Sequence, residues 1–246
     1  MDKYFSSRAT VRDFRNEDVP LSLIEEILKA AMRAPTCGNM QLYSVIVTRE
    51  PEARRALAET HFNQPAATGA PVILTICADF NRFSRWCRLS DAKPGYDNFL
   101  SFLTATTDAV ILAQQITTIA EMEGLGTCWL GTVTYNAARI SELLSLPDLV
   151  VPVAALSIGW PASKPERCER LPLEACMHLE RYRDDSDSKV MELFKAKDEF
   201  EPNARFVAEN GKTSLAQVFT DVRYPEAMNV EVSKALLDLL RNKKFM

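Results

Sequence analysis

The segment that decides the fold is NFLSFLTATTDAVILAQQITTIAEMEGLGTCWLG, residues 98–131. Its first part, about residues 98–123, repeats apolar side chains at helical spacing and predicts one long helix. The repeating stripe consists of Phe99, Phe102, Leu103, Val110, Ala113, Ile116 and Ala120. Further apolar residues stand outside it: Leu100, Ile111, Leu112 and Ile119. A helix that is apolar over so much of its circumference must be buried on more than one side, which its own core and a second subunit would explain.

The segments on either side of this helix alternate between extended and helical patterns. After the helix, GLGTCWLG at 124–131 predicts a glycine-terminated helix end that turns into a strand. Further strands are predicted at 43–48, 71–80 and 150–160. Further helices are predicted at 22–33, 51–59, 136–146 and 231–241. The alternation lacks the regular rhythm of a doubly wound sheet, so the sequence predicts an α+β fold in which a small mixed β-sheet is wrapped by helices.

Two local patterns refine this prediction. Ser22 and Glu25 have the spacing of a capping box, which places the start of the first helix at Ser22. Pro35 disfavours a helical conformation at the residue before it, so this helix should end there. Residues 81–97 are polar and irregular, and we expect them to form a surface excursion without regular structure.

The C-terminal quarter of the chain is more polar than the rest. Residues 161–172 form a charged loop punctuated by prolines, and two or three amphipathic segments follow residue 183. These segments hold too few apolar residues to build a core of their own. We therefore expect one domain over residues 1–183 and a C-terminal extension over 184–246, which packs on the main body or on a partner subunit and is not an independent domain.

Composition excludes several classes of protein. The 246 residues carry a formal net charge of -4, with 47% hydrophobic and 25% charged residues. A main partner such as nucleic acid or an anionic membrane would need a basic footprint instead. The N-terminus has no apolar signal core, and no run of about 18 apolar residues predicts a membrane span. The six cysteines form no CxxC pair, which favours reduced thiols in a cytoplasmic protein.

Common catalytic fingerprints are missing from the sequence. No GxGxxG follows a predicted strand, and neither GxxxxGK[ST] nor GxSxG occurs. The two histidines, His61 and His178, have no second histidine or cysteine at ligand spacing, so no metal site is expected. If the chain is an enzyme, its chemistry should belong to a bound organic cofactor.

Three irregular segments are candidates for binding such a cofactor. Arg8, Thr10 and Arg12 would point to one side of an extended chain, which suits a phosphate. APTCGNMQ at 34–41 offers hydroxyl and amide groups in a loop. Glycines in 124–131 and in GWP at 159–161 allow close approach of a flat ligand. Each segment taken alone also has an ordinary reading, namely a solvated arm, a helix-ending turn and turn-making glycines.

Taken together, these segments resemble the FMN-dependent nitroreductases. The resemblance is carried by R-x-[ST]-x-R-x-F at 8–14, AP[ST]xxNxQ at 34–41, GLGTxWxG at 124–131 and GxP followed by ERLPLE. HFNQ at 61–64, CADFNR at 77–82 and LAQVFTDVRY at 215–224 are similar to the branch of oxygen-insensitive nitroreductases and NADPH-flavin oxidoreductases. The resemblance implies a nitroreductase-like α+β fold that dimerises through its long central helix, with FMN bound between the subunits.

The resemblance also implies which residues contact FMN. Arg8, Thr10 and Arg170 would hold the phosphate, and Arg12 would approach the pyrimidine edge of the ring. Pro35, Thr36, Cys37 and Asn39 would line the isoalloxazine from the other subunit. Gln64 would lie near the ring, and the backbone of Leu130, Gly131 and Thr132 would approach N5. Cys168 stands where close relatives carry a second base, so Arg167 or Lys164 would complete the phosphate site.

The implied reaction passes hydride from NADPH or NADH through FMN to a nitroaromatic, a quinone or a free flavin by a ping-pong mechanism. No protein residue need act as acid or base, so no catalytic residue is assigned. A flavin-binding protein that sequesters or senses FMN with little turnover is the alternative. Arg82, Arg85 and Arg88 lie in the 81–97 region and would favour the extra phosphate of NADPH over NADH.

Overall fold

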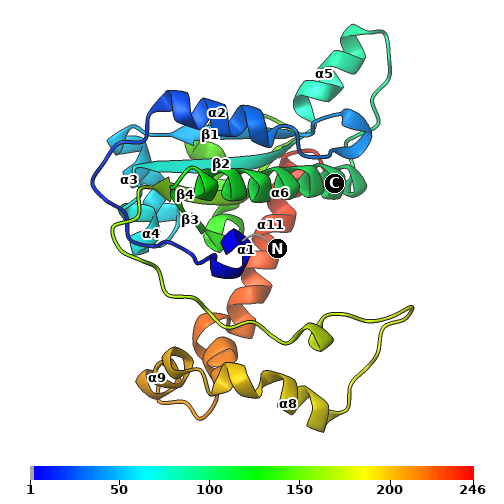
Figure 1. The fold of residues 1–246 in the computed structure, drawn as a ribbon. Coiled ribbons are helices and arrows are strands. Elements are labelled where there is room, and N and C mark those ends of the chain that lie inside the picture. Colours follow the sequence, from blue (N-terminus) through cyan, green and yellow to red (C-terminus); the bar gives the residue numbers. More distant parts are fainter. Residues whose placement is uncertain (1–2) are drawn as a thin grey trace. The chain divides into compact units, whose positions relative to one another are not determined.

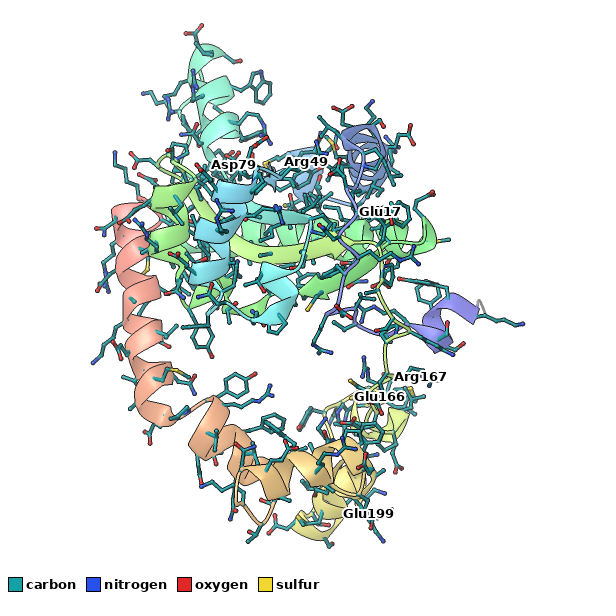
Figure 2. The ribbon with its side chains drawn as sticks, turned by 90° about the vertical axis from the view of Figure 1, so that its left-hand side faces the viewer. Glu17, Arg49, Asp79, Glu166, Arg167 and Glu199 are labelled. Atoms are coloured by element: carbon teal, nitrogen blue, oxygen red, sulfur yellow. The ribbon has the colours of Figure 1, made fainter. Side chains whose placement is uncertain are left out.

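The computed structural model describes residues 3–246, which form two compact units. The first unit comprises the described residues up to Glu166 together with Val232–Met246, and the second is Arg167–Glu231. Figure 2 labels Glu166 and Arg167, where one unit ends and the other begins. The boundary predicted at residue 183 lies inside the second unit.

A four-stranded sheet forms the centre of the first unit. Its strands occur in the order β1-β2-β4-β3, with the bounds β1 Tyr43–Thr48, β2 Val72–Asp79, β3 Gly126–Trp129 and β4 Val150–Gly159. Every pairing among these strands is antiparallel, from Tyr43 opposite Ala78 to Gly126 opposite Gly159. The α+β class is therefore confirmed, whereas the sheet described here is antiparallel and not mixed. The central strand β2 is buried on both faces along its whole length, as its apolar run predicts.

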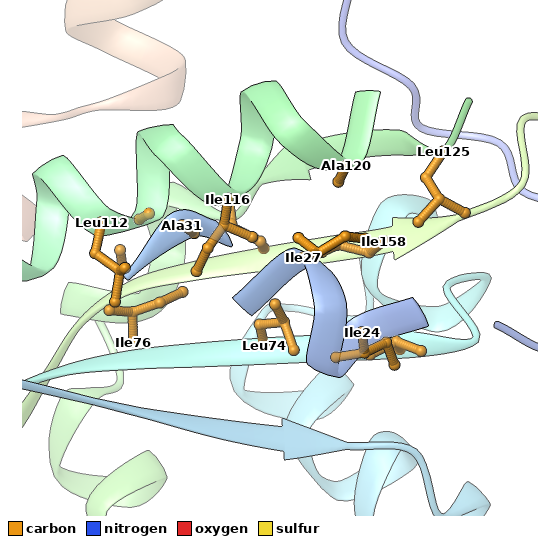
Figure 3. Packing of buried hydrophobic residues seen from close by; sticks show 14 of the residues in the cluster. Ile24, Ile27, Ala31, Leu74, Ile76, Leu112, Ile116, Ala120, Leu125 and Ile158 are labelled. Atoms are coloured by element: carbon orange, nitrogen blue, oxygen red, sulfur yellow. The ribbon is translucent and has the colours of Figure 1, made fainter. Parts of the chain in front are cut away.

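Helices cover both faces of this sheet. The helices of the first unit are α1 Lys3–Ser7, α2 Leu21–Ala31, α3 Pro51–Thr60, α4 Pro65–Thr68, α5 Asn81–Leu89, α6 Phe99–Met122, α7 Ala137–Leu143 and the 3-10 turns η1 Cys37–Asn39 and η2 Gly131–Thr134. Helices α2 and α6 pack side by side over one face (Figure 1). Figure 3 shows Ile27 of α2, Ile116 of α6 and Leu74 of the sheet within one cluster of buried residues. The opposite face is covered by α3, α4 and α7.

The long helix α6 confirms the segment from which the fold was predicted. Asn98 caps its N-terminus by accepting a hydrogen bond from the backbone N–H of Ser101 at 3.0 Å. Of the described chain, α6 is the one helix whose length and composition would allow a membrane crossing. Its buried residues, among them Leu112 and Ile116, pack against the sheet and α2, which identifies a core helix of the fold.

Two local predictions were wrong. Helix α2 begins at Leu21 with Pro20 as its N-cap, and no side chain caps it, so Ser22 is not a capping residue. The carbonyl of Pro20 already accepts the first helical bond, from the N–H of Ile24 at 3.2 Å. Half of the 81–97 region is the helix α5 instead of an irregular excursion. The carboxylate of Asp79, labelled in Figure 2, accepts hydrogen bonds from the first backbone N–H groups of α5.

The second unit is mainly helical. It holds η3 Leu173–Ala175, α8 Asp187–Asp198, α9 Glu201–Glu209, α10 Leu215–Gln217, the π-turn η4 Val218–Arg223 and the first residues of α11 Glu226–Asn242. Within this unit Glu169 accepts hydrogen bonds from Lys197 at 2.7 Å and from Asn203 at 3.1 Å. The last turns of α11 belong to the first unit, where Leu239 and Leu240 form a cluster with Phe245.

Candidate flavin site

The N-terminal arm runs along the edge of the sheet. The N–H of Val11 donates to the carbonyl of Thr127 on β3 at 3.0 Å, and Phe14 forms a bridge with Pro161 beyond β4. A Cβ on Gly126 would lie 2.6 Å from the side chain of Val11, so the arm can approach β3 this closely only because residue 126 is glycine. The arm that carries Arg8, Thr10 and Arg12 is therefore fixed beside the strand that leads to residues 130–132.

Arg8 is held by a nearly buried carboxylate near the end of α6. Its Nε and Nη2 donate to Glu121 at 3.2 and 3.1 Å, and the Glu121 side chain is only 9% exposed. The same carboxylate accepts hydrogen bonds from Tyr4 at 2.7 Å and from Thr127. Burial and the bond to Glu121 raise the pKa of Tyr4 to about 12, so this phenol stays neutral. Two of the five N–H donors of Arg8 are used in this way, and the other three bond no residue that the structure describes, so they could hold an anion.

Thr10 and Arg12 belong to the same arm. Thr10 is half-buried and Arg12 is exposed, and neither side chain bonds another described residue. The positive charges of Arg12 and Arg8 both act on the buried thiol of Cys128, whose pKa burial raises. Glu121 offsets the charge of Arg8, so Arg12 is the cation near β3 that no carboxylate of a described residue pairs.

The 35–41 segment is shaped by a residue that the sequence analysis missed. Asp108, buried in the middle of α6, accepts hydrogen bonds from the backbone N–H of Cys37 at 2.9 Å and of Leu42 at 3.3 Å. Between these two anchors the chain forms the turn η1, with Gly38 and Asn39 in left-handed conformations. The clue in the sequence is a single carboxylate inside a long apolar helix, which must find hydrogen-bond partners there.

This anchoring opens a hollow between the 35–37 segment and α6. The hollow has a volume of about 350 Å³ and is lined by Pro35, Thr36, Cys37, Thr104, Thr107, Asp108 and Ile111. Pro35, Cys37 and Asn39 are exposed and Thr36 is half-buried, so the predicted ring-lining residues remain accessible in the single chain.

Gln64 and Thr132 meet although they lie 68 positions apart in the sequence. The amide Nε2 of Gln64 donates to the hydroxyl Oγ1 of Thr132 at 3.2 Å. Nδ1 of His61 lies 2.8 Å from the same hydroxyl. His61 is fully buried, and burial lowers its pKa to about 4, so it is neutral at pH 7. The sequence analysis assigned no role to His61, because nothing in its spacing points to Thr132.

The backbone beside Thr132 is open. Leu130 is buried and its N–H donates to the carbonyl of Ala155 at 2.8 Å, so its side chain belongs to the core and not to the site. Gly131 is exposed, and a Cβ built on it would meet no atom within 4 Å. A flat ligand could therefore approach the backbone at Gly131, where no side chain stands in the way.

Three basic residues of the predicted phosphate site lie around the boundary between the units. Lys164 is exposed at the end of the first unit. Arg167 and Arg170 are exposed in the second unit, where Nη1 of Arg170 donates to the carbonyl of Glu169 at 2.8 Å. Their contribution to a phosphate site with Arg8 stays a prediction.

Arg82 has a structural role that the sequence did not reveal. Its guanidinium donates to Asp79 at 3.3 Å, to the hydroxyl of Ser44 and to the carbonyls of Gln41 and Tyr43. These bonds tie the start of α5 to β1. Of the three arginines considered for NADPH, only Arg85 and Arg88 remain exposed without such bonds among the described residues.

Comparison with known proteins identifies the family. The Nitroreductase family profile matches residues 5–160. Two relatives are the FMN reductase [NAD(P)H] of Bacillus subtilis, 36% identical over 73% of each chain, and the oxygen-insensitive NADPH nitroreductase of Salmonella typhimurium, 33% identical over 71% of each. A crystal structure from Bacteroides fragilis superimposes with a TM-score of 0.98 at 43% identity and covers 100% of both chains. The chain therefore belongs to the nitroreductase family.

Proposed function

We propose that this nitroreductase-family chain is an FMN-dependent oxidoreductase that takes electrons from NADPH or NADH. The observation that carries the proposal is the meeting of Gln64 and Thr132 beside the open backbone of Gly131. The names of the two relatives, an FMN reductase using NAD(P)H and an NADPH nitroreductase, support the same cofactor and donor.

The residues present fit FMN. Over the uncovered peptides at Gly131 a side chain would meet open space, and a flat ring can use that space. Gln64 and Thr132 would orient the ring, and Arg12 would supply positive charge at its pyrimidine edge. When bound, FMN would supply hydride transfer from NAD(P)H to a nitroaromatic, a quinone or a free flavin in a ping-pong cycle.

Arg8 would bind the phosphate, while Glu121 holds the guanidinium of Arg8 in position. Its three remaining N–H donors match phosphate oxygens, and Arg170 with Arg167 or Lys164 would balance the rest of the charge. Thr10, half-buried on the same arm, would add a hydroxyl donor.

We further propose a cytoplasmic homodimer. The outer face of α6 exposes apolar side chains, among them Leu100 at 73% and Leu103 at 46%, and such a row on one helix is typical of an interface. The hollow at Pro35, Thr36 and Cys37 borders the same helix. Packing of two copies through α6 would place the ring-lining segment of one subunit against the other. The six free thiols are consistent with a reducing compartment.

An absorption spectrum followed by anaerobic titration with NADPH and then NADH tests the function. We expect flavin bands that bleach, and the faster donor identifies the nicotinamide preference. Flavin bands that do not bleach would favour the FMN-sequestering alternative. Failure to take up FMN would refute the proposal.

A second experiment tests the phosphate assignment. Arg8→Ala alone would leave the nearly buried Glu121 without its cationic partner, so it should be combined with Glu121→Gln. The double variant should bind FMN at least tenfold more weakly than Glu121→Gln alone, since a charge-assisted phosphate contact contributes about 1.5–3 kcal/mol. Arg15→Ala, at an exposed arginine of the same arm, is the control and should leave FMN affinity unchanged.

A further inference from the structure

His61, Thr132 and Gln64 form a hydrogen-bonded group at the rim of the candidate site. Thr132 and Gln64 are half-buried, while His61 behind them is fully buried. His61 and Gln64 stand at the two ends of one tight turn, in which Phe62 and Asn63 both take left-handed conformations, and Gln64 is the N-cap of α4, which begins with Pro65. The backbone of this turn therefore fixes where the side chain of Gln64 starts.

The donors and acceptors of this group determine where the Thr132 proton goes. The Gln64 amide nitrogen can only donate, so it occupies one lone pair of the Thr132 hydroxyl oxygen. The contact with His61 Nδ1 then leaves two arrangements. In one, Nδ1–H donates to Thr132, and in the other, Thr132 donates to an unprotonated Nδ1.

The other ring nitrogen of His61 favours the first arrangement. Nε2 is buried and has no hydrogen-bond partner among the described residues. If Thr132 donated to Nδ1, a neutral ring would carry its proton on Nε2 as a buried, unpaired N–H. Such orphaned donors are rarer in protein interiors than incompletely paired acceptors. With the proton on Nδ1, Thr132 accepts from both His61 and Gln64, and its own proton must point elsewhere.

We propose that His61 is a positioning residue that forces the Thr132 hydroxyl to donate its proton outward, to an acceptor atom of the isoalloxazine. This inference rests on the proposed function. Thr132 directly follows Gly131, over which a side chain would meet open space, and Thr132 is itself half-buried, so a flat ligand over Gly131 would lie beside it. A hydroxyl held by two donors cannot turn its proton inward without breaking one of these bonds, so the group is prearranged before FMN binds.

Variants of Thr132 and His61 test this proposal. Thr132→Val removes the hydroxyl and keeps the shape, and Thr132→Ser keeps the hydroxyl as the matched control. Loss of one hydrogen bond should weaken FMN binding about tenfold in Thr132→Val. It should also shift the absorption maximum and the reduction potential of the bound flavin, and Thr132→Ser should restore all three. His61→Leu should reproduce the Thr132→Val effect, whereas His61→Asn, whose amide can donate from the position of Nδ1, should stay close to wild type.

The decisive comparison is the double variant His61→Leu/Thr132→Val. If His61 acts through Thr132, the double variant should bind FMN no more weakly than Thr132→Val alone. Additive losses, or an unchanged flavin spectrum in His61→Leu at an unchanged thermal midpoint, would overturn the proposal. Nitrogen-15 NMR of apo-protein should show Nδ1 protonated and Nε2 unprotonated, and the opposite tautomer would also overturn it. This readout needs no flavin, so failure to bind FMN would refute the proposed function separately.

Discussion

Acidification should destabilise this protein through one histidine, His61. Burial lowers its pKa from 6.5 to about 4, so the folded chain resists protonation that the unfolded chain accepts. Above about pH 6.5 the His61 ring is neutral in both the folded and the unfolded state, so it does not change the free energy of unfolding with pH. Between 6.5 and 4 only the unfolded state binds the proton, and the free energy of unfolding falls as the pH falls. The pKa difference of about 2.5 corresponds to a loss of about 3 kcal/mol, complete near pH 4.

The assay is urea unfolding at fixed protein concentration from pH 8 to pH 4, for wild type and His61→Asn. Buried or paired carboxylates also titrate in this range, but they contribute equally to both proteins. The difference between the two curves therefore isolates His61. It should stay flat above pH 7 and change by about 3 kcal/mol, at up to about 1.4 kcal/mol per pH unit.

The other histidine of the chain provides the control. His178 is half-buried, and its Nδ1 accepts a hydrogen bond from the N–H of Arg183 at 3.1 Å. His178→Asn should leave the NMR titration midpoint of His61 unchanged, because the hydrogen bonds of the two rings involve different residues. Parallel curves for wild type and His61→Asn, or an NMR titration of His61 with a midpoint of 6 or higher, would refute the argument from burial.

Three further predictions concern the anchors of the candidate site and the helix beside it. Leu103→Glu should convert the proposed dimer to monomers in light scattering, while the control Leu89→Glu, at a more exposed leucine on α5, stays dimeric; a dimer in both would exclude α6 as the interface. Asp108→Asn should cost about 2 kcal/mol in urea unfolding, because one backbone donor loses its charged acceptor, whereas a cost no greater than that of the exposed Asp97→Asn would contradict the anchoring role. Gly126→Ala should displace the N-terminal arm and weaken FMN binding, and an affinity as high as that of the unobstructed Gly95→Ala would show that the arm tolerates the methyl group.

Hydrophobic periodicity correctly predicted those helices and strands in which the apolar residues are also the buried ones. The strand at 43–48 and the helix at 98–123 were confirmed nearly to the residue, because period and burial agree there. The α5 helix was missed since its exposed arginines dominate the composition. What stabilises it is a capping carboxylate from the preceding strand end and aromatic packing of Phe83 on Phe80 and Tyr96. These stabilising contacts come from residues that are close in space, so they produce no hydrophobic periodicity in the sequence of α5 itself.

The sequence could not separate the two faces of α6. Ala113 shares the predicted stripe with Leu103, yet Ala113 is fully buried in the core and Leu103 is exposed. A charge at Ala113 would therefore test folding, and only outward residues can test assembly. Hydrophobic patterns in the sequence could likewise not predict that every described strand pairing is antiparallel, because strand direction depends on which distant strands pair.

The candidate site shows the same limit. The motifs pointed to Arg8, Gln64 and Thr132, but the contacts of Arg8 with Glu121 and of Thr132 with His61 could not be predicted. The spacing of residues along the sequence does not reveal a hydrogen-bond partner more than 70 positions away. A residue that contacts a ligand, in contrast, is part of a recognisable motif.

The polar residues of α6 connect the core to the candidate site. Asp108 accepts two backbone N–H groups of the 37–42 segment, Thr117 accepts the indole N–H of Trp129 on β3 at 2.9 Å, and Glu121 holds Arg8. One helix therefore fixes the ring-lining segment, the strand that leads to the open backbone, and the arm that carries the arginines. Because the apolar residues between these anchors pack on the sheet, the helix cannot shift at one anchor without shifting at the others. A subunit that packs on the outer face of α6 would consequently stabilise the geometry of all three segments together.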